Sequence, residues 1–351
     1  MALFHIIPVS IRCTSTSWIH IQAGHISQHR PCMNDAKHAT MIVITSASGR
    51  QASSFIPLLL SNSLGPLRLV VKSASSEERL RSAYPSAEVI RADLAHPDEC
   101  TRVVRDAVTI YHVNPSFHPA ETELGKNMVD AALAESKRSG NGFKHFVFSS
   151  VIQTQLRKLM NHDVKRYVEE YLMESGLNYT ILKPTTFLDN FTPALKGLVQ
   201  DAANGKHELE YKAAWSPDVL FSELAMRDLG EASLKVITER EKHYFASYDL
   251  ASTMPQPWGK KIDLLAAEIG CNIKVDIQPL QQVVPGFIKT LLGCSSEEAH
   301  FVTVDTAERM ILYYNRHGIV GNPAILEMIL GRKATTTEDW IKEQVASAKQ
   351  N

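Results

Sequence analysis

The sequence predicts an α/β fold in which a doubly wound parallel sheet is followed by a smaller C-terminal α+β lobe. Short apolar segments alternate with amphipathic segments in units of about 30 residues between residues 41 and 184. A turn of small residues follows the first apolar segment and leads into the start of a helix. The alternation ends near residue 184. We therefore expect the sheet domain at 41–184 and the lobe at 185–351, with helices of the lobe packing back on the sheet.

The elements of the sheet domain follow one another in strict order. We expect strands at 41–45, 67–71, 88–91, 108–113, 143–149 and 179–182. We expect helices between them at 51–60, 75–82, 97–106, 121–136 and 163–174. Pro57 should kink the first helix or remove one backbone hydrogen bond, whereas Pro97 suits a first helical turn and Gly176 a helix end. Such alternation predicts ligand binding beyond the carboxyl ends of the strands.

The lobe has a less regular pattern. We expect helices near 191–204, 228–238, 259–269 and 306–317, mixed with short strands and many turns. A lobe of this kind caps the sheet, and it is where we expect the selectivity for the substrate to lie.

The composition is that of an ordinary globular protein and argues against two classes. Hydrophobic residues make up 44% of the chain, charged residues 21%, and the net charge is −1. This balance does not suggest a direct nucleic-acid binder. No apolar run approaches the roughly 20 residues that span a bilayer, so we expect no membrane partner. The five cysteines lie far apart without a CxxC pair, which is typical of reduced intracellular thiols and predicts no metal site.

Residues 1–40 differ from the rest of the chain. Serine, threonine and histidine are frequent, Arg12 and Arg30 are present, and no acidic residue precedes Asp35. This pattern is compatible with an organelle transit peptide. The alternative is a disordered extension ahead of Met41, with translation starting further upstream. We favour the extension and a cytoplasmic protein, with a nuclear or mitochondrial location as the alternatives.

The turn after the first strand has the order of a dinucleotide-binding fingerprint. Its three glycine places are held by Ser46, Gly49 and Ala52. The backbone N–H groups of such a turn, and of the helix that follows, can hold a phosphate. Ser46, Gly49, Arg50 and Gln51 are therefore candidate cofactor-binding residues.

The type of cofactor can be argued from the second strand, which ends Val71-Lys72-Ser73 without a carboxylate. An acidic residue there would bind the ribose 2′-hydroxyl of NAD, whereas a base accommodates the 2′-phosphate of NADP. Lys72 and Arg50 thus favour NADP over NAD. The alternative is that both are solvated surface bases.

Three further strand ends offer cofactor contacts. Asp93 follows the third strand and could accept from the adenine amino group or cap the next helix. Asn114 and Phe117 follow the fourth strand and could line the cofactor. The alternative is that this segment is simply an Asn-Pro turn. Pro184, after the sixth strand, is another candidate contact.

The main catalytic candidate is Lys165, on the helix expected at 163–174. It shares a row with Asn161, Val168 and Leu172 and lies beside an apolar stripe that includes Tyr167. A lysine here could hold the nicotinamide ribose hydroxyls or transfer a proton. The alternative is a surface lysine.

Other polar residues stand near this helix. Ser149 and Ser150 follow the fifth strand, where they could orient a carbonyl or simply pack. His162 is a candidate proton relay or a surface histidine. Reductases with a parallel sheet that binds a dinucleotide commonly place a tyrosine four residues before such a lysine, but position 161 is asparagine. That tyrosine–lysine device is therefore absent.

Taken together, the sequence resembles the NmrA-like atypical short-chain dehydrogenase/reductases, including fungal ones. The resemblance covers about residues 41–345. It is carried by the segments Ser46-Ala47-Ser48-Gly49-Arg50-Gln51, Arg91-Ala92-Asp93-Leu94, 125–132, Lys144-His145-Phe146-Val147-Phe148-Ser149-Ser150, Tyr179-Thr180-Ile181-Leu182-Lys183-Pro184, 186–191, 313–318 and Leu330-Gly331-Arg332. It implies a Rossmann domain with a small substrate lobe.

The resemblance also implies roles for particular residues. The phosphate turn maps to Ser46, Gly49, Arg50 and Gln51. The basic residue after the second strand maps to Lys72, the adenine carboxylate to Asp93, and the helix lysine of the reductases to Lys165. Serine and alanine in two glycine places should weaken close approach to the pyrophosphate.

Two functions follow from this comparison. The first is an NADPH-dependent oxidoreductase that reduces a carbonyl or conjugated alkene of a small polyketide-like or aromatic secondary metabolite. Lys165, or a water that it holds, would supply the proton, and Ser149 would orient the oxygen. The second is a non-catalytic sensor of the dinucleotide that binds a transcription factor.

Overall fold

The computed structural model describes residues 41–140 and 142–350, and seven parallel strands form its main sheet. Their order is β11-β6-β5-β4-β1-β2-β3, the doubly wound order with one strand added beyond β6. The strands are β1 Met41–Ile44, β2 Leu67–Val71, β3 Glu88–Arg91, β4 Ala107–Val113, β5 His145–Ser149, β6 Tyr179–Pro184 and β11 Ala246–Leu250. The predicted fold class is confirmed.

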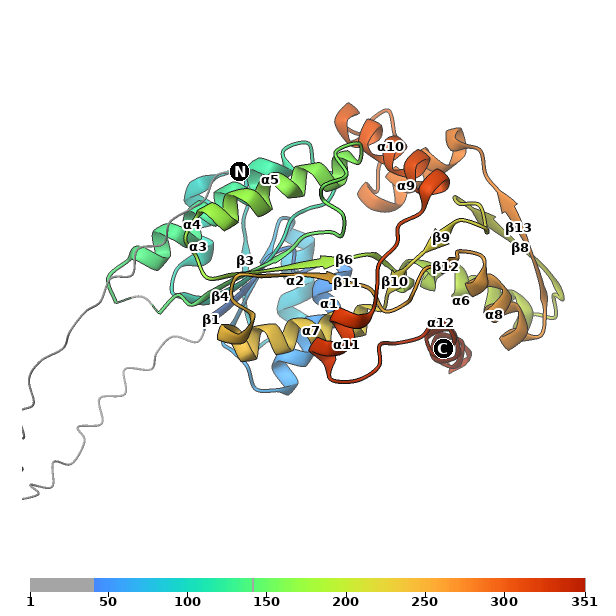
Figure 1. Ribbon diagram of the computed structural model, residues 1–351, viewed down its shortest axis with the longest axis horizontal. Helices are drawn as coiled ribbons and strands as arrows, with labels where there is room; N and C mark the ends of the chain where they lie inside the picture. The colour runs from blue at the N-terminus through green and yellow to red at the C-terminus, as the bar shows by residue number, and fades with distance from the viewer. Residues whose placement is uncertain (1–40, 141, 351) are drawn as a thin grey trace, which may run out of the picture. The chain divides into compact units, whose positions relative to one another are not determined.

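Helices cover both faces of the sheet. One face packs against α1 Arg50–Ser61, α2 Ala74–Ala83, α7 Met226–Glu239 and α11 Ala324–Leu330, and the other against α3 Pro97–Val104, α4 Glu121–Lys137 and α5 Met160–Glu174 (Figure 1). Successive side chains of a strand point to opposite faces. Ile42 and Ile44 therefore join the first core and Val43 the second. Burial on both faces explains why the inner strands β1, β4 and β5 are largely apolar, whereas the edge strands β3 and β11 carry exposed polar residues.

Most expected elements lie within a few residues of the observed ones, and the differences have local causes. Helix α1 continues through Pro57 to Ser61, although Pro57 cannot donate to the Ser53 carbonyl. Helix α5 begins at Met160 and buries Asn161, Lys165, Val168 and Leu172, as the predicted row requires. The prediction that Tyr167 belongs to the apolar stripe was wrong. Tyr167 is 40% exposed, and the centroid of its ring lies 4.1 Å from the Arg166 guanidinium carbon.

The chain beyond residue 184 contributes to two bodies of structure. Strand β11 pairs in parallel with β6 and extends the main sheet, and α7 packs in the core beneath it. Helix α11 also packs in that core, and most of the remaining segments form a separate core. They include α6 Thr192–Ala203, β8 Glu208–Ala213, α8 Lys260–Ile269, β13 Asn272–Ile277, α9 Leu280–Leu292, α10 Phe301–His317 and α12 Thr337–Gln350. We call this second body the lobe.

Short elements connect the sheet to the lobe. They are β7 Thr186–Phe187, the 3₁₀ turn Leu188–Phe191, β9 Leu220–Phe221, β10 Glu223–Leu224, the 3₁₀ turn Arg240–His243 and β12 Gln256–Pro257. Strand β7 continues almost directly from β6 and pairs with β10, so the end of the main sheet leads straight into the lobe. This connection places the lobe at the carboxyl ends of the strands.

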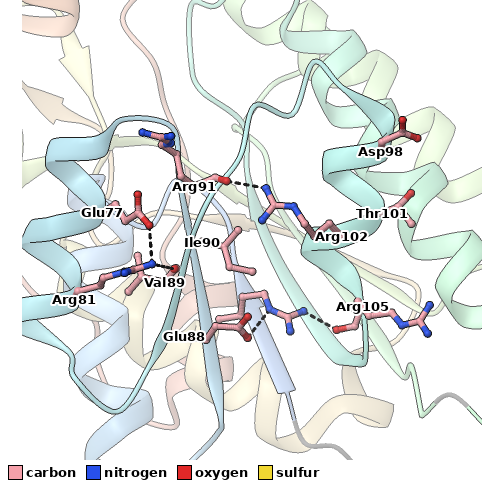
Figure 2. Close-up of a pocket in the computed structure, with 11 residues that line it drawn as sticks. Glu77, Arg81, Glu88, Val89, Ile90, Arg91, Asp98, Thr101, Arg102 and Arg105 are labelled. Carbon is pink, nitrogen blue, oxygen red and sulfur yellow. Dashed lines mark hydrogen bonds and ion pairs between the residues drawn. The ribbon is translucent and has the colours of Figure 1, made fainter.

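Strand β3 is one edge of the sheet, and arginines surround it. A hollow of about 800 Å³ lies beside β3 and is lined by residues of α2 and α3 (Figure 2). Arg81 of α2 donates to the Val89 carbonyl at 3.4 Å, and Arg102 of α3 donates to the Arg91 carbonyl at 2.8 Å. Arg68 of β2 bonds the Glu88 carboxylate at 2.8 Å. The edge is thus bonded from both flanking helices.

One sequence prediction concerns a region beyond this description. The leader at 1–40 lies outside the described residues. In the ranges that the structure describes, no helix is long and apolar enough to cross a membrane.

Candidate functional site

A cleft at the carboxyl ends of the strands contains three cavities. The first, which we call the groove, has a volume of about 520 Å³ and runs along the ends of β1, β2 and β3. The second, the neck, has about 130 Å³ and lies where β5, β6 and α5 meet. The third, the aromatic pocket, has about 580 Å³ and lies in the lobe. Phe187 lines all three, so they adjoin one another.

The phosphate turn forms one wall of the groove. Ser46 has a φ of +48°, a left-handed value that explains the glycine usually found there. Its hydroxyl donates to the Val113 carbonyl at 2.7 Å, so the side chain is tied to β4. Ala52 is buried in the core of the same face, where its methyl group packs. Both substitutions are therefore accommodated within the fold.

Helix α1 presents its N-terminus to the groove. Gly49 precedes it, and a Cβ at that position would lie 3.1 Å from the Ser46 carbonyl oxygen. Among the described residues, no side chain caps this helix end and no acid lies in its first turn. Free N–H groups at a helix N-terminus favour an anion. Arg50, the first helical residue, lines both the groove and the aromatic pocket.

The far end of the groove holds the expected base and carboxylate together. Lys72 Nζ lies 3.0 Å from Asp93 Oδ2. The Ala95 N–H and Lys72 hold the pKa of Asp93 below its usual value. Asp93 accepts from Ala95 N at 3.1 Å, in the turn ahead of α3. The N-cap position of α3 itself is held by His96. Sequence reasoning missed Arg79 of α2, which donates to the Ser48 carbonyl at 3.2 Å and adds a second base beside the turn.

Asn114 lies in a buried chain of hydrogen bonds beneath the groove. Its Oδ1 is 2.6 Å from His112 Nε2, and His112 Nδ1 is 2.9 Å from the Thr45 hydroxyl. Its Nδ2 donates to the Glu121 carbonyl at 3.1 Å. Burial lowers the pKa of His112 to about 4, so this imidazole is neutral at pH 7. The chain fixes the start of α4 against the ends of β1 and β4.

Lys165 projects into the neck and forms a buried ion pair with Glu121 of α4. The lysine side chain is 7% exposed and that of Glu121 is fully buried. Lys165 Nζ also donates to the Asn161 carbonyl at 3.2 Å, and Glu121 Oε2 accepts from Phe117 N at 3.1 Å. Burial raises the pKa of Glu121, while Lys165 acts in the opposite direction. The pair holds the ammonium group in a fixed position.

Ser149 reaches the neck from the end of β5. Its Oγ accepts from Gln51 Nε2 at 2.6 Å, and Gln51 Nε2 also lies 3.0 Å from the Tyr111 hydroxyl. Gln51 therefore connects the start of α1 to the neck, a contact between residues 98 positions apart. Pro184 lines the same cavity from β6. The structure thus brings Gln51, Ser149, Lys165 and Pro184 together.

Asn161 also lines the neck, one turn before Lys165. Its Oδ1 is buried and has no hydrogen-bond partner among the described residues. His162 lies next to it but bonds elsewhere, with Nε2 at 2.8 Å from the Tyr314 hydroxyl of α10. Burial lowers the pKa of His162 to about 4. This histidine joins α5 to the lobe and is not among the residues that line the neck.

Ser150 is held differently from Ser149. Its hydroxyl bonds the buried carboxylate of Glu169, which also accepts from Thr154 at 3.1 Å and pairs with Lys183 at 2.9 Å. These bonds fix the loop between β5 and α5. Ser150 is therefore a positioning residue for the neck wall.

The cleft fits a nicotinamide dinucleotide in two respects. The uncapped N-terminus of α1 suits the diphosphate, and the unmet acceptor Asn161 Oδ1 in the neck suits a donor group of a ligand. Residues that would hold the dinucleotide are Ser46, Gly49, Arg50, Gln51, Lys72, Asp93, Asn114 and Lys165.

Solved structures with the same fold support this topology. The chain aligns with the NADPH complex of quinone oxidoreductase QOR2 from Escherichia coli at a TM-score of 0.66 and 18% identity, covering 86% of this chain and 99% of that one. Triphenylmethane reductase from Citrobacter sp., complexed with NADP(H), aligns at 0.65 and 17%, covering 87% and 99%. NmrA, a negative transcriptional regulator complexed with NADP, aligns at 0.65 and 17%, covering 89% and 97%.

Sequence comparison agrees with the structural one. A curated relative from Cladobotryum sp., the NmrA-like family domain-containing oxidoreductase FrzB, is 29% identical over 166 residues. The match spans 43% of this chain and 48% of that relative, about half its length. The NmrA-like family model matches residues 38–258, from just before β1 to β12. The chain belongs to the NmrA-like family.

Proposed function

We propose that this protein is an NADPH-dependent reductase that acts on a carbonyl or conjugated alkene of a small aromatic or polyketide-like metabolite. One observation carries the proposal. The neck, which joins the groove to the aromatic pocket, is lined by both Ser149 and Lys165. A proton donor and a hydrogen-bonding hydroxyl thus lie where a cofactor and a substrate would meet.

The cofactor part of the proposal favours NADP over NAD. Lys72 and Arg79 lie beside the turn after β1, where a 2′-phosphate would lie, and no carboxylate ends β2. Asp93 pairs with Lys72 and is within reach of the adenine side. Bound NADPH would supply the hydride. Three structural relatives that bind NADP(H) share this fold and support the choice.

The proton part rests on Lys165. Its ammonium group donates a proton to the substrate oxygen, or to the carbon next to the reduced one in an alkene, directly or through a water that it holds. The Glu121 carboxylate pairs with Nζ and keeps it in the neck. Ser149 turns its hydroxyl toward the substrate oxygen while Gln51 holds its position. Lys165 then regains its proton from solvent.

The test begins with calorimetry of NADPH, NADP⁺ and NADH, followed by NADPH oxidation with a panel of aromatic ketones and enones. We expect NADPH to bind more tightly than NADH and at least one compound to be reduced. The double variant Lys165→Met/Glu121→Gln, which removes both charges, should still bind NADPH through the turn after β1 and Lys72, although more weakly, and should lose turnover. Lys158→Met, at an exposed lysine, is the matched control. Undiminished turnover in the double variant would remove the assigned role of Lys165.

A second function is favoured by the absence of the tyrosine at position 161 and by the fold of NmrA. In this alternative the protein senses the dinucleotide and binds a transcription factor without turnover. A pull-down with NADP⁺ or NADPH would then recover a partner in a cofactor-dependent manner. The reductase is expected in the cytoplasm and the regulator in the nucleus, which a fluorescent fusion distinguishes.

A further inference from the structure

The aromatic pocket combines apolar walls with one buried ion pair. Its walls carry the rings of Phe187, Phe191, Tyr211, Trp215, Phe221, Trp258 and Phe287. Its lining also includes Glu223 of β10 and Lys261 of α8, which pair with one another. Their side chains are only 5% and 3% exposed, respectively. A ligand in this pocket therefore meets flat aromatic surfaces and one site of paired charge.

The aromatic rings surround the ammonium group of this pair. Lys261 Nζ lies 5.0 Å from the ring centroid of Trp258 and 5.8 Å from that of Phe191. Tyr211 stacks on Trp258 with centroids 5.7 Å apart. Burial, together with the nearby Glu223 carboxylate, raises the pKa of Tyr211 to about 12, so its hydroxyl is protonated and uncharged at neutral pH.

The pair is held rigidly. Glu223 N donates to the Thr253 hydroxyl at 2.9 Å, and the Glu223 carbonyl accepts from Ser252 N at 2.8 Å. Lys261 lies in the first turn of α8, which begins directly after Gly259, and a Cβ at Gly259 would lie 2.7 Å from the Cβ of Pro217. The start of α8 is therefore packed directly against the loop before β9. A preorganised polar group of this kind suits recognition of a ligand.

Stability does not explain a charged pair in an apolar pocket. Two ions lose their hydration when they are buried, and this cost can exceed their mutual attraction. Replacing a buried ion pair with apolar side chains of similar volume is therefore often neutral or stabilising. The polar side chains Lys212 and Gln282, which are exposed, and Gln278, which is half-buried, also line the pocket. The buried charges are thus confined to Glu223 and Lys261 among its described lining residues. The pair offers a donor and an acceptor side by side.

We propose that Glu223 and Lys261 bind a phenolic hydroxyl of an aromatic substrate. A hydroxyl both donates and accepts, so it can donate to the Glu223 carboxylate and accept from the Lys261 ammonium. The pair is neutral overall, which favours an uncharged phenol. The rings of the pocket hold the aromatic body of the ligand.

This inference rests on the proposed reductase function for the reacting end of the substrate. Phe187 lines both the neck and the aromatic pocket, so a flat ligand passing it would place its carbonyl in the neck and its phenol at the pair. The substrate class is therefore a phenol whose ring system also carries the reducible carbonyl.

The test uses two ketones that differ by one methyl group, 6-hydroxy-2-acetonaphthone and 6-methoxy-2-acetonaphthone. The methoxy oxygen accepts from Lys261 but cannot donate to Glu223. Calorimetry with the full chain, with and without NADP⁺, gives both affinities. We expect the hydroxy compound to bind about tenfold more tightly or better, because the methoxy compound cannot donate to Glu223 and would instead place a methyl group against the carboxylate.

Variants place this discrimination on the pair. Glu223→Leu/Lys261→Met removes both charges, and we expect the affinity ratio to fall to about one while NADP⁺ binding is kept. Gln282→Ala, in the exposed part of the lining, should leave the ratio unchanged. The comparison of the two ketones in the wild-type chain needs no variant to fold.

The outcomes separate the two proposals. Equal affinity for both ketones, binding of neither, or a ratio that persists in the double variant overturns the phenol site. If the ratio holds but NADP⁺ does not bind, the phenol site stands and the reductase function fails. If NADP⁺ binds but both ketones bind equally, the phenol site fails and the reductase function stands.

Discussion

Replacing Lys165 with methionine should destabilise the protein as well as stop its chemistry. The Glu121 side chain is fully buried, and the variant would leave it with the Phe117 N–H at 3.1 Å but without its cationic partner. Removing one partner of a buried ion pair costs about 3–5 kcal/mol. We therefore expect the free energy of unfolding of Lys165→Met to fall by about that amount near neutral pH.

The cost should depend on pH with a definite sign. In the variant, burial without Lys165 raises the pKa of Glu121 in the folded state above its unfolded value of about 4.5. Between those two values the folded state binds more protons, so stability falls as pH rises, by up to about 1.4 kcal/mol per pH unit. The difference from wild type is therefore smaller at pH 5 than at pH 8.

Urea unfolding followed by circular dichroism at the two pH values measures this effect. Glu121→Gln/Lys165→Met should recover most of the lost stability, because neither charge is left unpaired. The reasoning is refuted if the single variant is as stable as the double variant, or if its loss is the same at pH 5 and pH 8.

Three other predictions follow from the described contacts. Ser46→Gly should be about 1 kcal/mol more stable to urea than Ser46→Ala, because both lose the bond to Val113 but only alanine is strained at φ +48°; equal stability contradicts this. Arg79→Ala should lower the ratio of NADPH to NADH affinity in calorimetry about tenfold, and an unchanged ratio would place the 2′-phosphate elsewhere. Acidification from pH 6.5 should destabilise the fold, because burial lowers the pKa of three histidines in the folded state. As the pH falls, these histidines take up protons in the unfolded state before they do so in the folded state. A melting temperature that does not change down to pH 4.5 argues against this. These histidines are His112, His145 and His162, with pKa values of about 4, 3 and 4.

The sheet domain was predictable because its information is local. Each strand is a short apolar run, and turn residues or a helix start follow it, so the alternation alone gives the parallel order. Strand β11 was not identifiable in this way, since its Ala246 pairs with Thr180 of β6, 66 positions earlier in the chain. Helix α9 was not predicted either, and it contains Pro285, which usually argues against a helix interior.

The candidate site was only partly predictable for the same reason. Lys165 lies on a recognisable helical row, and the turn after β1 has a known order of small residues. Glu121 is 44 residues from Lys165 and looks like an ordinary acid in a first helical turn. Glu223 and Lys261 come from separate short elements of the lobe, and no spacing in the sequence relates them.

The bonds along β3 bear on how the molecule behaves when crowded. A sheet edge with vacant carbonyl groups is a template on which a strand of a neighbouring molecule can add. Here the guanidinium groups of Arg81 and Arg102 already occupy the carbonyls of Val89 and Arg91, and they bring positive charge to the rim. A strand of another molecule would have to displace these guanidinium groups before it could pair with β3. Edge-to-edge association of sheets through β3 is therefore disfavoured.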